Sequence, residues 1–394
     1  MDERITQRTG GSHSRAKIIT PFNVVAVIIL AIGIPVIIYR FANGLGAATN
    51  LSNTNPWGLW IGFDVLTGVA LAAGGYVLAS SVYLFGLRDY YPVLRAAILT
   101  GFLGYFFVVV GLLVDLGQPW RLPYPVFYSY GVTSVLFLVA WHVFLYLTVQ
   151  FLEFSPAVCE WLGWKKVLRW VTSLTIGVTI AGVVLSTLHQ SALGALFLMF
   201  PTKLHPLWYS QFIPVFFFIS SIIGGLAMVI VESSLSHSIF RDRLDPERHV
   251  DLGGLTLGLG KAASVVLFAY FFLKLLGIAD GNHWGLLNTP LGYWFLVEIL
   301  GFILLPCFLF AFGVRANNVG LVRFASILTV IGIVINRLNV SVVALNWNVT
   351  NRYFPSWMEI IITITIITIG ILTFRWIVNR MPVLQEYPEF RGAH

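Results

Sequence analysis

Charged side chains are scarce in this chain of 394 residues. Lys, Arg, Asp and Glu together make up 10% of it, whereas hydrophobic residues make up 58%. Soluble domains carry about 25% charged residues, so this class is excluded. Apolar runs of about 20 residues recur along the chain, as membrane-spanning helices require. The alternation over about ten residues that marks a transmembrane barrel is absent. The sequence therefore predicts an all-α, polytopic membrane protein.

Cysteine is nearly absent. The two cysteines, Cys159 and Cys307, are far apart and form no CxxC pair. An iron–sulfur cluster usually takes four thiolates, so we expect no such cluster on this chain. No metal site is predicted either. The formal net charge is +7, but the basic residues lie in short loops between apolar runs. This pattern is the signature of membrane topology and gives no reason to expect nucleic acid as a partner.

Ten apolar stretches are long enough to cross a membrane. Because ten is an even number, both termini should lie on one side. Most of the 24 Lys and Arg residues fall on that side, which predicts cytoplasmic termini in a bacterial inner membrane and outer, periplasmic loops. The predicted spans lie near residues 19–40, 57–86, 92–116, 126–152, 166–188, 207–236, 258–278, 289–313, 320–345 and 356–379.

Spans two and six begin alike, with Asn55-Pro56-Trp57 and His205-Pro206-Leu207-Trp208. Proline suits the first turn of a helix and tryptophan suits the membrane interface. The similarity hints at two four-helix bundles flanked by helices one and ten. We therefore expect a cytoplasmic tail (1–18), helix one with an outer loop (19–56), a first bundle (57–190), a second bundle (191–345), a tenth helix (346–379) and a second cytoplasmic tail (380–394).

Asp64 lies inside the second predicted span. It shares a stripe with small residues at helical spacing, among them Gly68, Ala72 and Gly75. Small residues let helices approach closely, so Asp64 should face the bundle and not lipid. An acid inside the membrane is either a functional group, which handles protons or binds a ligand, or a structural brace. We favour the functional role.

Asp115 and His189 end the third and fifth predicted spans at the same outer level as Asp64. Their convergence indicates a site in the outer half of the first bundle. An ion pair between Asp115 and Arg121 at the membrane interface is the structural alternative. His142, on the predicted span 126–152, should lie about 24 Å below the outer start of that span, at 1.5 Å per residue. It is either a structural group or a proton relay toward the cytoplasm.

Depth also argues against a haem. Two axial histidines must face one iron at one level, but the predicted spans place His142 and His189 at very different depths. In the second bundle, Glu298 and Arg337 should lie at similar depths on spans eight and nine. They are expected to form a buried pair, either as a brace or as part of a proton path.

Several stretches together resemble a known family. The chain is similar to the NrfD/polysulfide-reductase membrane-subunit superfamily, and most of all to its ten-helix branch, which contains the HybB-type subunits of nickel–iron hydrogenases and the DsrP and HmcC types of other complexes. The resembling stretches are NPWGLWIGFDVLTG, PVLRAAILTGFLGY, SVLFLVAW, LEFSPAVCEWLGW, TLHQSALGAL, KLHPLWYS, VIVESSL, INRLNVSVVALN and YFPSWMEI.

The resemblance implies an integral subunit that exchanges electrons with menaquinone or ubiquinone. It implies no haem, and a ferredoxin-like iron–sulfur partner on the outer face that links to the large and small hydrogenase subunits. The chain itself would hold a quinone site and no other catalytic centre. The quinone pocket is expected in the first bundle, at Trp57, Asp64, Asp115, Arg121 and His189.

Within that pocket, Asp64 is our first choice as the proton-exchanging group, because quinone reduction takes up two protons. His189 is the second choice and Asp115 the third. The chain departs from the hydrogenase relatives on helix four, where Leu138 replaces a glutamate one turn from His142. A family-type proton path there requires His142 to substitute for the acid. A subunit of another respiratory complex, a secondary transporter or proton channel, and a haem-b electron carrier are the competing readings.

Overall fold

The computed structural model describes residues 19–244, 250–385 and 387. Ten helices in these parts of the chain are long and apolar enough to cross a membrane, and the described residues contain no strand. The predicted all-α, ten-span fold is confirmed. The tail 1–18 and most of the tail 380–394 lie outside the described residues.

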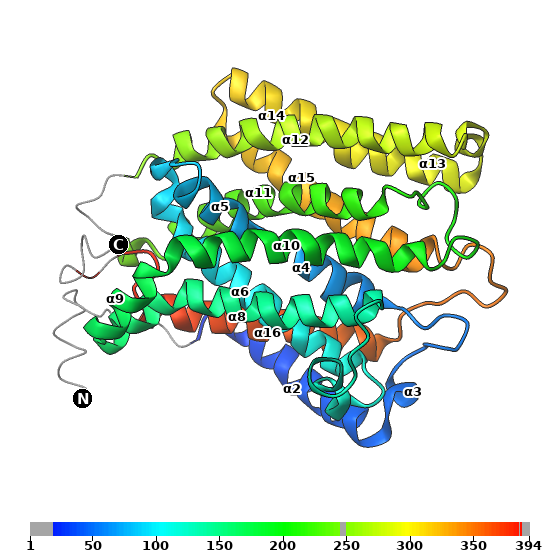
Figure 1. Ribbon diagram of the computed structural model, residues 1–394, viewed down its shortest axis with the longest axis horizontal. Coiled ribbons are helices and arrows are strands. Elements are labelled where there is room, and N and C mark those ends of the chain that lie inside the picture. Colours follow the sequence, from blue (N-terminus) through cyan, green and yellow to red (C-terminus); the bar gives the residue numbers. More distant parts are fainter. Residues whose placement is uncertain (1–18, 245–249, 386, 388–394) are drawn as a thin grey trace.

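The helices run roughly parallel along the long axis of the molecule (Figure 1). Several spans consist of more than one helical segment. In chain order the spans are α2 (Pro21–Asn43), η1 (Trp60–Thr67) with α4 (Gly68–Leu71) and α5 (Gly74–Tyr83), α6 (Tyr91–Asp115), α8 (Val135–Leu162), α10 (Thr175–Leu198), α11 (Ile213–Ile239), α12 (Leu252–Asp280), α13 (Pro290–Leu296) with η6 (Val297–Leu304) and α14 (Leu305–Arg315), α15 (Val319–Leu338) with η7 (Asn339–Val343), and α16 (Trp357–Arg380).

Short helices connect the spans. They are α3 (Leu45–Ala48), η2 (Arg88–Tyr90), η3 (Pro119–Arg121), α7 (Tyr124–Phe127), α9 (Lys165–Ser173), η4 (Arg241–Arg243) and η5 (Trp284–Asn288).

Local sequence explains where the outermost spans begin. Thr20 caps α2 by accepting a hydrogen bond from the Asn23 amide at 3.2 Å, and Pro21 occupies the first turn. α16 begins with a capping box, in which Ser356 and Glu359 each accept a hydrogen bond from the other's backbone amide. Both devices satisfy amides that have no partner within the helix.

Spans four and five lie nearer the C-terminus than predicted, at Val135–Leu162 and Thr175–Leu198 instead of 126–152 and 166–188. Two features of the sequence account for the shift. Pro123, Pro125 and Gly131 interrupt the apolar stretch before α8, and proline removes a helical hydrogen-bond donor. The segment from Lys165 forms a separate helix, α9, after Gly163 adopts a left-handed φ of 72°.

The spans pack closely on one another. α5, α6, α8 and α10 are neighbours, α11 packs against both α10 and α5, and α11 also packs with α12 and α15. The backbones of α5 and α11 approach closely, since a Cβ on Gly225 would lie 2.7 Å from the Gly74 nitrogen. The exact division into 57–190 and 191–345 stays a prediction.

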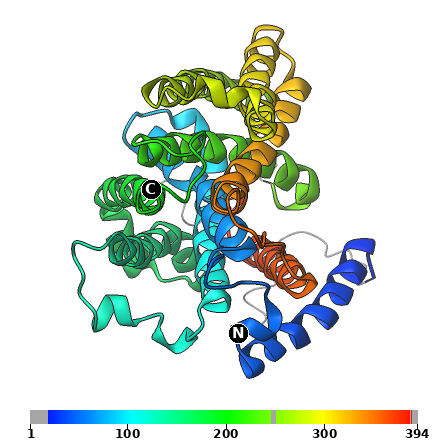
Figure 2. The same cartoon turned by 90° about the vertical axis from the view of Figure 1, so that its right-hand side faces the viewer.

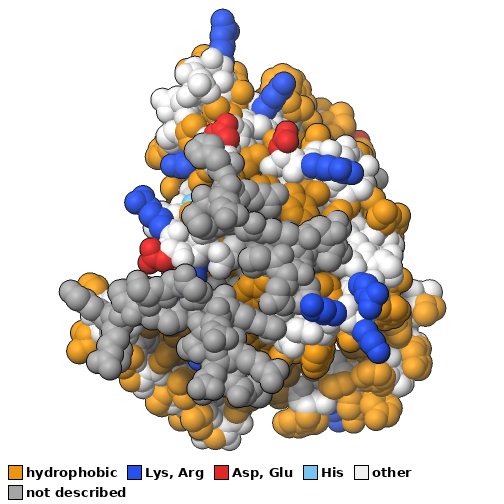
Figure 3. Space-filling view, turned by 90° about the vertical axis from the view of Figure 1, so that its left-hand side faces the viewer, with side chains coloured by type: hydrophobic (Ala, Val, Ile, Leu, Met, Phe, Trp, Pro, Cys, Tyr) orange, Lys and Arg blue, Asp and Glu red, His pale blue; other side chains and the backbone are white. Residues whose placement is uncertain are grey.

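The first and last spans pack on each other. α2 packs on α16, and α16 packs against α6. Figure 2 shows α2 at the periphery, with α16 between it and the rest of the molecule. The start of α2 and the end of α16 lie at the same end of the molecule (Figure 1). Figure 3 looks onto that end, where Lys and Arg side chains outnumber Asp and Glu. We call this the inner end; its cytoplasmic location stays a prediction.

Candidate functional site

Asp64 lies on η1 and faces other helices. Its side chain is 8% exposed, and its Oδ2 accepts a hydrogen bond of 2.8 Å from the Thr363 hydroxyl on α16. On the other side is Gly111 of α6, where an added Cβ would lie 2.9 Å from the Cβ of Asp64. Asp64 therefore sits between α6 and α16, turned inward as its stripe of small residues predicts.

The segment that carries Asp64 is a π-helix, in which each amide bonds five residues back instead of four. The Gly68 amide bonds the Phe63 carbonyl, and the Thr67 hydroxyl bonds the Gly62 carbonyl at 3.0 Å. Trp60 fastens the same segment to α16 by donating from Nε1 to the Glu359 carbonyl at 3.2 Å. π-Helical turns are frequent at functional sites.

Asp115 ends α6 beside Arg40 of α2. The Arg40 guanidinium is 1% exposed and donates to the carbonyls of Val114 at 2.6 Å and Leu116 at 2.5 Å. It thereby satisfies carbonyls that the end of the helix leaves without a partner. Asp115 interacts electrostatically with Arg40 and with Asp64, and its buried Oδ1 has no hydrogen-bond partner among the described residues.

Glu359 is the third acid of this region and is fully buried. Its carboxylate accepts hydrogen bonds from the Tyr353 hydroxyl, from the Ser356 amide at 2.7 Å and from the Asn50 amide at 3.2 Å. Burial raises the pKa of Tyr353, and the bond to Glu359 raises it further. Tyr353 therefore stays protonated and serves as a donor to the carboxylate.

Asp64, Asp115, Glu359 and Arg40 form what we call the outer acid cluster. It holds three carboxyl groups and one guanidinium inside the protein. Like charges close together in a medium of low polarity repel each other strongly, and the single guanidinium offsets one of the three carboxyl groups at most.

His189 lies in a different cluster. It is on α10, fully buried, with its ring 5.6 Å from that of Tyr105, which in turn packs 4.6 Å from Tyr146. Ser186, one turn before His189, lies beside both phenols and Tyr76. We call Tyr76, Tyr105, Tyr146, Ser186 and His189 the phenol–histidine cluster. No hydrogen bond among the described residues joins it to Asp64 or Asp115.

The two histidines lie at similar depths, which corrects the depth argument. His142 is seven residues after the start of α8 and His189 nine before the end of α10, or about 10 and 14 Å below the outer ends. They also interact electrostatically. The prediction failed because both spans begin and end further along the chain than expected.

Trp57 and Arg121 lie apart from the acids. Trp57 packs edge-on against Phe197 at 5.4 Å and Phe200 at 5.2 Å, and lines a small hollow with Lys203. Arg121 is exposed, with its guanidinium 5.7 Å from the centre of the Tyr124 ring. The basic neighbour of Asp115 is Arg40, not Arg121.

Glu298 and Arg337 belong to one buried network, but their link is indirect. Glu298 accepts hydrogen bonds from Trp208 (2.9 Å), Asn336 (2.7 Å) and Asn339 (2.6 Å). Arg337 donates to the Asn336 side chain at 2.8 Å, so Asn336 bridges the two charges. Arg337 also donates to the Ser220 hydroxyl at 2.7 Å and lies 3.9 Å from the Phe217 ring centre.

Sequence reasoning missed Arg40, Glu359, Thr363 and Tyr353. A local signal existed for Glu359, because Ser356 and Glu359 have the spacing of a capping box. Thr363 lies four residues after Glu359, so the two share one face of α16. For Arg40 the sequence shows only a basic residue near the end of an apolar run, which is ordinary for a span.

The sequence has informative relatives. A model of the family described as "Polysulphide reductase, NrfD" matches residues 47–349. A protein of Nitratidesulfovibrio vulgaris whose name states no activity is 54% identical over 385 residues, covering 97% of this chain and 99% of its own. The "Probable Ni/Fe-hydrogenase 2 b-type cytochrome subunit" of Escherichia coli is 32% identical over 354 residues, covering 88% of each chain. The "Menaquinone reductase, integral membrane subunit" of Nitratidesulfovibrio vulgaris is 26% identical over 389 residues, covering 89% of this chain and 88% of its own.

The name of the Escherichia coli relative, a b-type cytochrome subunit, contradicts our expectation that this chain carries no haem. The predicted difference in depth between His142 and His189 is also wrong. His142 and His189 lie on neighbouring helices. His142 Nδ1 and both ring nitrogens of His189 have no hydrogen-bond partner among the described residues. Their similar depth removes the objection, raised from the predicted spans, to two axial histidines at one level.

Proposed function

Because the chain belongs to the NrfD, polysulphide reductase family, we propose that it is the quinone-reactive membrane subunit of a periplasm-facing redox complex. A nickel–iron hydrogenase is the proposed complex, with its large and small subunits and a ferredoxin-like iron–sulfur subunit on the outer face. Electrons would pass between that subunit and menaquinone or ubiquinone. The names of the hydrogenase and menaquinone reductase relatives support this assignment.

The outer acid cluster is the observation that carries the proposal. Reducing a quinone consumes two electrons and two protons, so an acid must lie within hydrogen-bond reach of a quinone oxygen. Asp64 is suited to this task because its carboxyl group accepts a single hydrogen bond, from Thr363, among the described residues. Asp115 interacts electrostatically with Asp64 and can share a proton with it, and Arg40 offsets the charge that remains.

The place of the cluster suits a lipid-soluble substrate. Its residues come from η1, α6, α2 and α16, and the side chains of α2 are largely exposed. The exposed side chains of α2 face the lipid in which a quinone diffuses. We place the pocket there, at Asp64 and Asp115, instead of among Trp57, Arg121 and His189.

The phenol–histidine cluster supports a route for protons. Its unpartnered polar atoms include Tyr105 Oη, Tyr146 Oη, Ser186 Oγ and both ring nitrogens of His189. Buried polar groups usually have partners, and internal water commonly supplies them. We propose that His142 and this cluster relay protons among α5, α6, α8 and α10. Glu298 and Arg337 are held by several hydrogen bonds each, which favours a bracing role for them.

A haem would supply one-electron transfer, and a haem held by His142 and His189 would replace the proton relay proposed for them. A reduced-minus-oxidised absorption spectrum of the purified chain measures its haem content directly. The quinone proposal does not depend on that result, because proton exchange at Asp64 is a property of this chain's own side chains.

The test is Asp64→Asn in the intact complex, with Asp280→Asn as the matched control, since Asp280 is exposed at the outer end of α12. Asp64→Asn should remove electron transfer from the donor to quinone, while electron transfer to a soluble dye at the partner subunits and subunit assembly stay normal. Asp280→Asn should leave both activities intact. Unchanged quinone turnover in Asp64→Asn would reject the role of Asp64, and the co-purifying subunits identify the complex.

A further inference from the structure

α9 has no role in the function proposed above, yet its three faces differ sharply. At 100° per residue, Leu168 and Val171 share the face that is buried against the protein. Lys166 and Arg169 project from the opposite face, and both are exposed. Val167 and Trp170 lie between these two faces and are 43% and 61% exposed.

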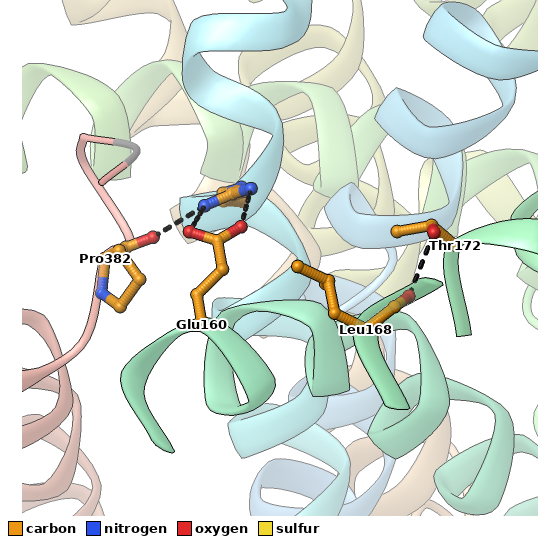
Figure 4. Close-up of polar contacts among 5 residues, drawn as sticks. Glu160, Leu168, Thr172 and Pro382 are labelled. Carbon is orange, nitrogen blue, oxygen red and sulfur yellow. Dashed lines mark hydrogen bonds and ion pairs between the residues drawn. The ribbon is translucent and has the colours of Figure 1, made fainter. Parts of the chain in front are cut away.

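The helix is held firmly in place at the inner end. Just before it, Glu160 accepts two hydrogen bonds from the Arg95 guanidinium, at 2.6 and 3.2 Å, and Arg95 also donates to the Pro382 carbonyl at 3.0 Å (Figure 4). Leu168 packs with Cys159 of α8. α9 therefore packs on the end of α8 and connects α8 to α10 (Figure 1).

The level of α9 identifies its surroundings. It lies where α8 ends and α10 begins, which is where we expect the boundary between the hydrocarbon and the headgroups of a bilayer. Trp164 is 55% exposed at its start and Trp170 61% exposed near its end. Tryptophan is enriched at this boundary, where its ring meets both lipid and water. The exposed apolar face of α9 therefore lies against acyl chains.

The positive charge of α9 favours lipids with anionic headgroups. The exposed face of α9 carries Lys166 and Arg169, and α9 contains no acidic residue. Glu160, near the end of α8, pairs with Arg95. Basic side chains beside an interfacial apolar face attract anionic lipids, because they reach the phosphate groups while the helix lies in the interface.

We propose that α9 is a binding site for anionic phospholipid headgroups at the inner leaflet. Lys166 and Arg169 contact the phosphate, and Trp164 and Trp170 pack beside the upper acyl chains. The site lies at the opposite end of the molecule from the outer acid cluster and is independent of the quinone proposal.

The experiment uses the full-length chain, purified in detergent, and measures lipid binding by native mass spectrometry and thermal unfolding. The probes are phosphatidylglycerol, phosphatidylcholine with the same acyl chains, and inorganic phosphate. Phosphatidylglycerol should bind more tightly and stabilise more than phosphatidylcholine, and inorganic phosphate should do neither. Equal effects of the two lipids, or an equal effect of inorganic phosphate, would overturn the proposal.

Variants locate the site. The double variant K166Q/R169Q should weaken phosphatidylglycerol binding about 25-fold, since each basic residue near an anionic surface contributes about fivefold. K166R/R169K keeps both charges and should bind normally. R241Q/R243Q is the matched control, because η4 is also exposed at the inner end but contains Asp242 and no tryptophan. An equal loss in R241Q/R243Q would mean that general surface charge, and not α9, attracts the lipid.

Discussion

The Thr363 hydroxyl donates a 2.8 Å hydrogen bond to Asp64 and so joins the tenth span to the second. The tenth span packs against α2 and α6, and it supplies both this donor and Glu359 to the outer acid cluster. Arg40 of the first span completes the cluster. The candidate site is therefore assembled by the first and last spans as much as by the second and third.

Thr363→Val tests this bond with little change in shape. The variant removes the donor to Asp64, and a hydrogen bond to a charged group contributes about 1.5–3 kcal/mol. We expect quinone turnover to fall by roughly tenfold or more, since 1.4 kcal/mol is a factor of ten. Thr368→Val is the control, because among the described residues the Thr368 hydroxyl bonds only the Ile364 carbonyl of its own helix. Similar turnover in the two variants would show that the bond to Asp64 is unimportant.

Arg40→Gln should destabilise the protein. It leaves the Val114 and Leu116 carbonyls without their donor and Asp115 without its basic neighbour. Removing one partner of a buried charged group costs about 3–5 kcal/mol. Thermal unfolding in detergent measures the loss. Arg121→Gln, at an exposed position, should change stability by no more than about 0.5 kcal/mol. A comparable loss of stability in both variants would show that the hydrogen bonds of the buried Arg40 side chain do not stabilise the protein.

Glu298 should tolerate glutamine better than leucine. Leucine leaves three buried donors, on Trp208, Asn336 and Asn339, without an acceptor, and each such loss costs about 1–3 kcal/mol. Glutamine retains one acceptor oxygen and nearly the same shape. We expect the unfolding temperature to decrease from the wild type to Glu298→Gln and again to Glu298→Leu. Wild-type stability in Glu298→Leu would show that this network does not brace the fold.

We expect the free energy of unfolding to fall in mild acid because of His205. Burial, and in second place the nearby His283, lower the pKa of His205 below its usual 6.5. Its Nδ1 accepts a hydrogen bond from the Leu207 amide, which requires a neutral ring. As the pH falls below 6.5, the unfolded chain takes up a proton that the folded protein resists. The free energy of unfolding therefore falls, by at most about 1.4 kcal/mol per pH unit from this residue.

The control for this prediction is His205→Asn, which offers an acceptor oxygen and cannot titrate in this range. Thermal unfolding at several pH values between 8 and 5 should give a smaller dependence on pH for the variant than for the wild type. Equal dependences would exclude His205 as the source.

The number of spans could be predicted from the sequence because long apolar runs leave few alternatives. The placement of α8 and α10 could not, since Pro123, Pro125 and the amphipathic α9 interrupt the hydrophobic pattern. Because both helices lie further along the chain than predicted, His142 and His189 lie at similar depths instead of different ones.

For the site, the inward direction of Asp64 followed from local spacing. The partners of Asp64 did not, because Thr363 lies 299 positions away in the sequence. Tyr76, Tyr105 and Tyr146 escaped notice because tyrosine does not interrupt an apolar run. Contacts of this kind depend on the register of packed helices, which no single segment determines.

The π-helix η1 has a consequence for how the second span could have arisen. A π-turn accommodates one more residue than an α-turn, so this span contains what amounts to a single-residue insertion at Asp64. Deleting one residue from this segment would restore ordinary α-helical spacing. It would also rotate everything on the N-terminal side by about 100° relative to the rest of the span. Asp64 would then turn away from Thr363, and the three acids would no longer meet.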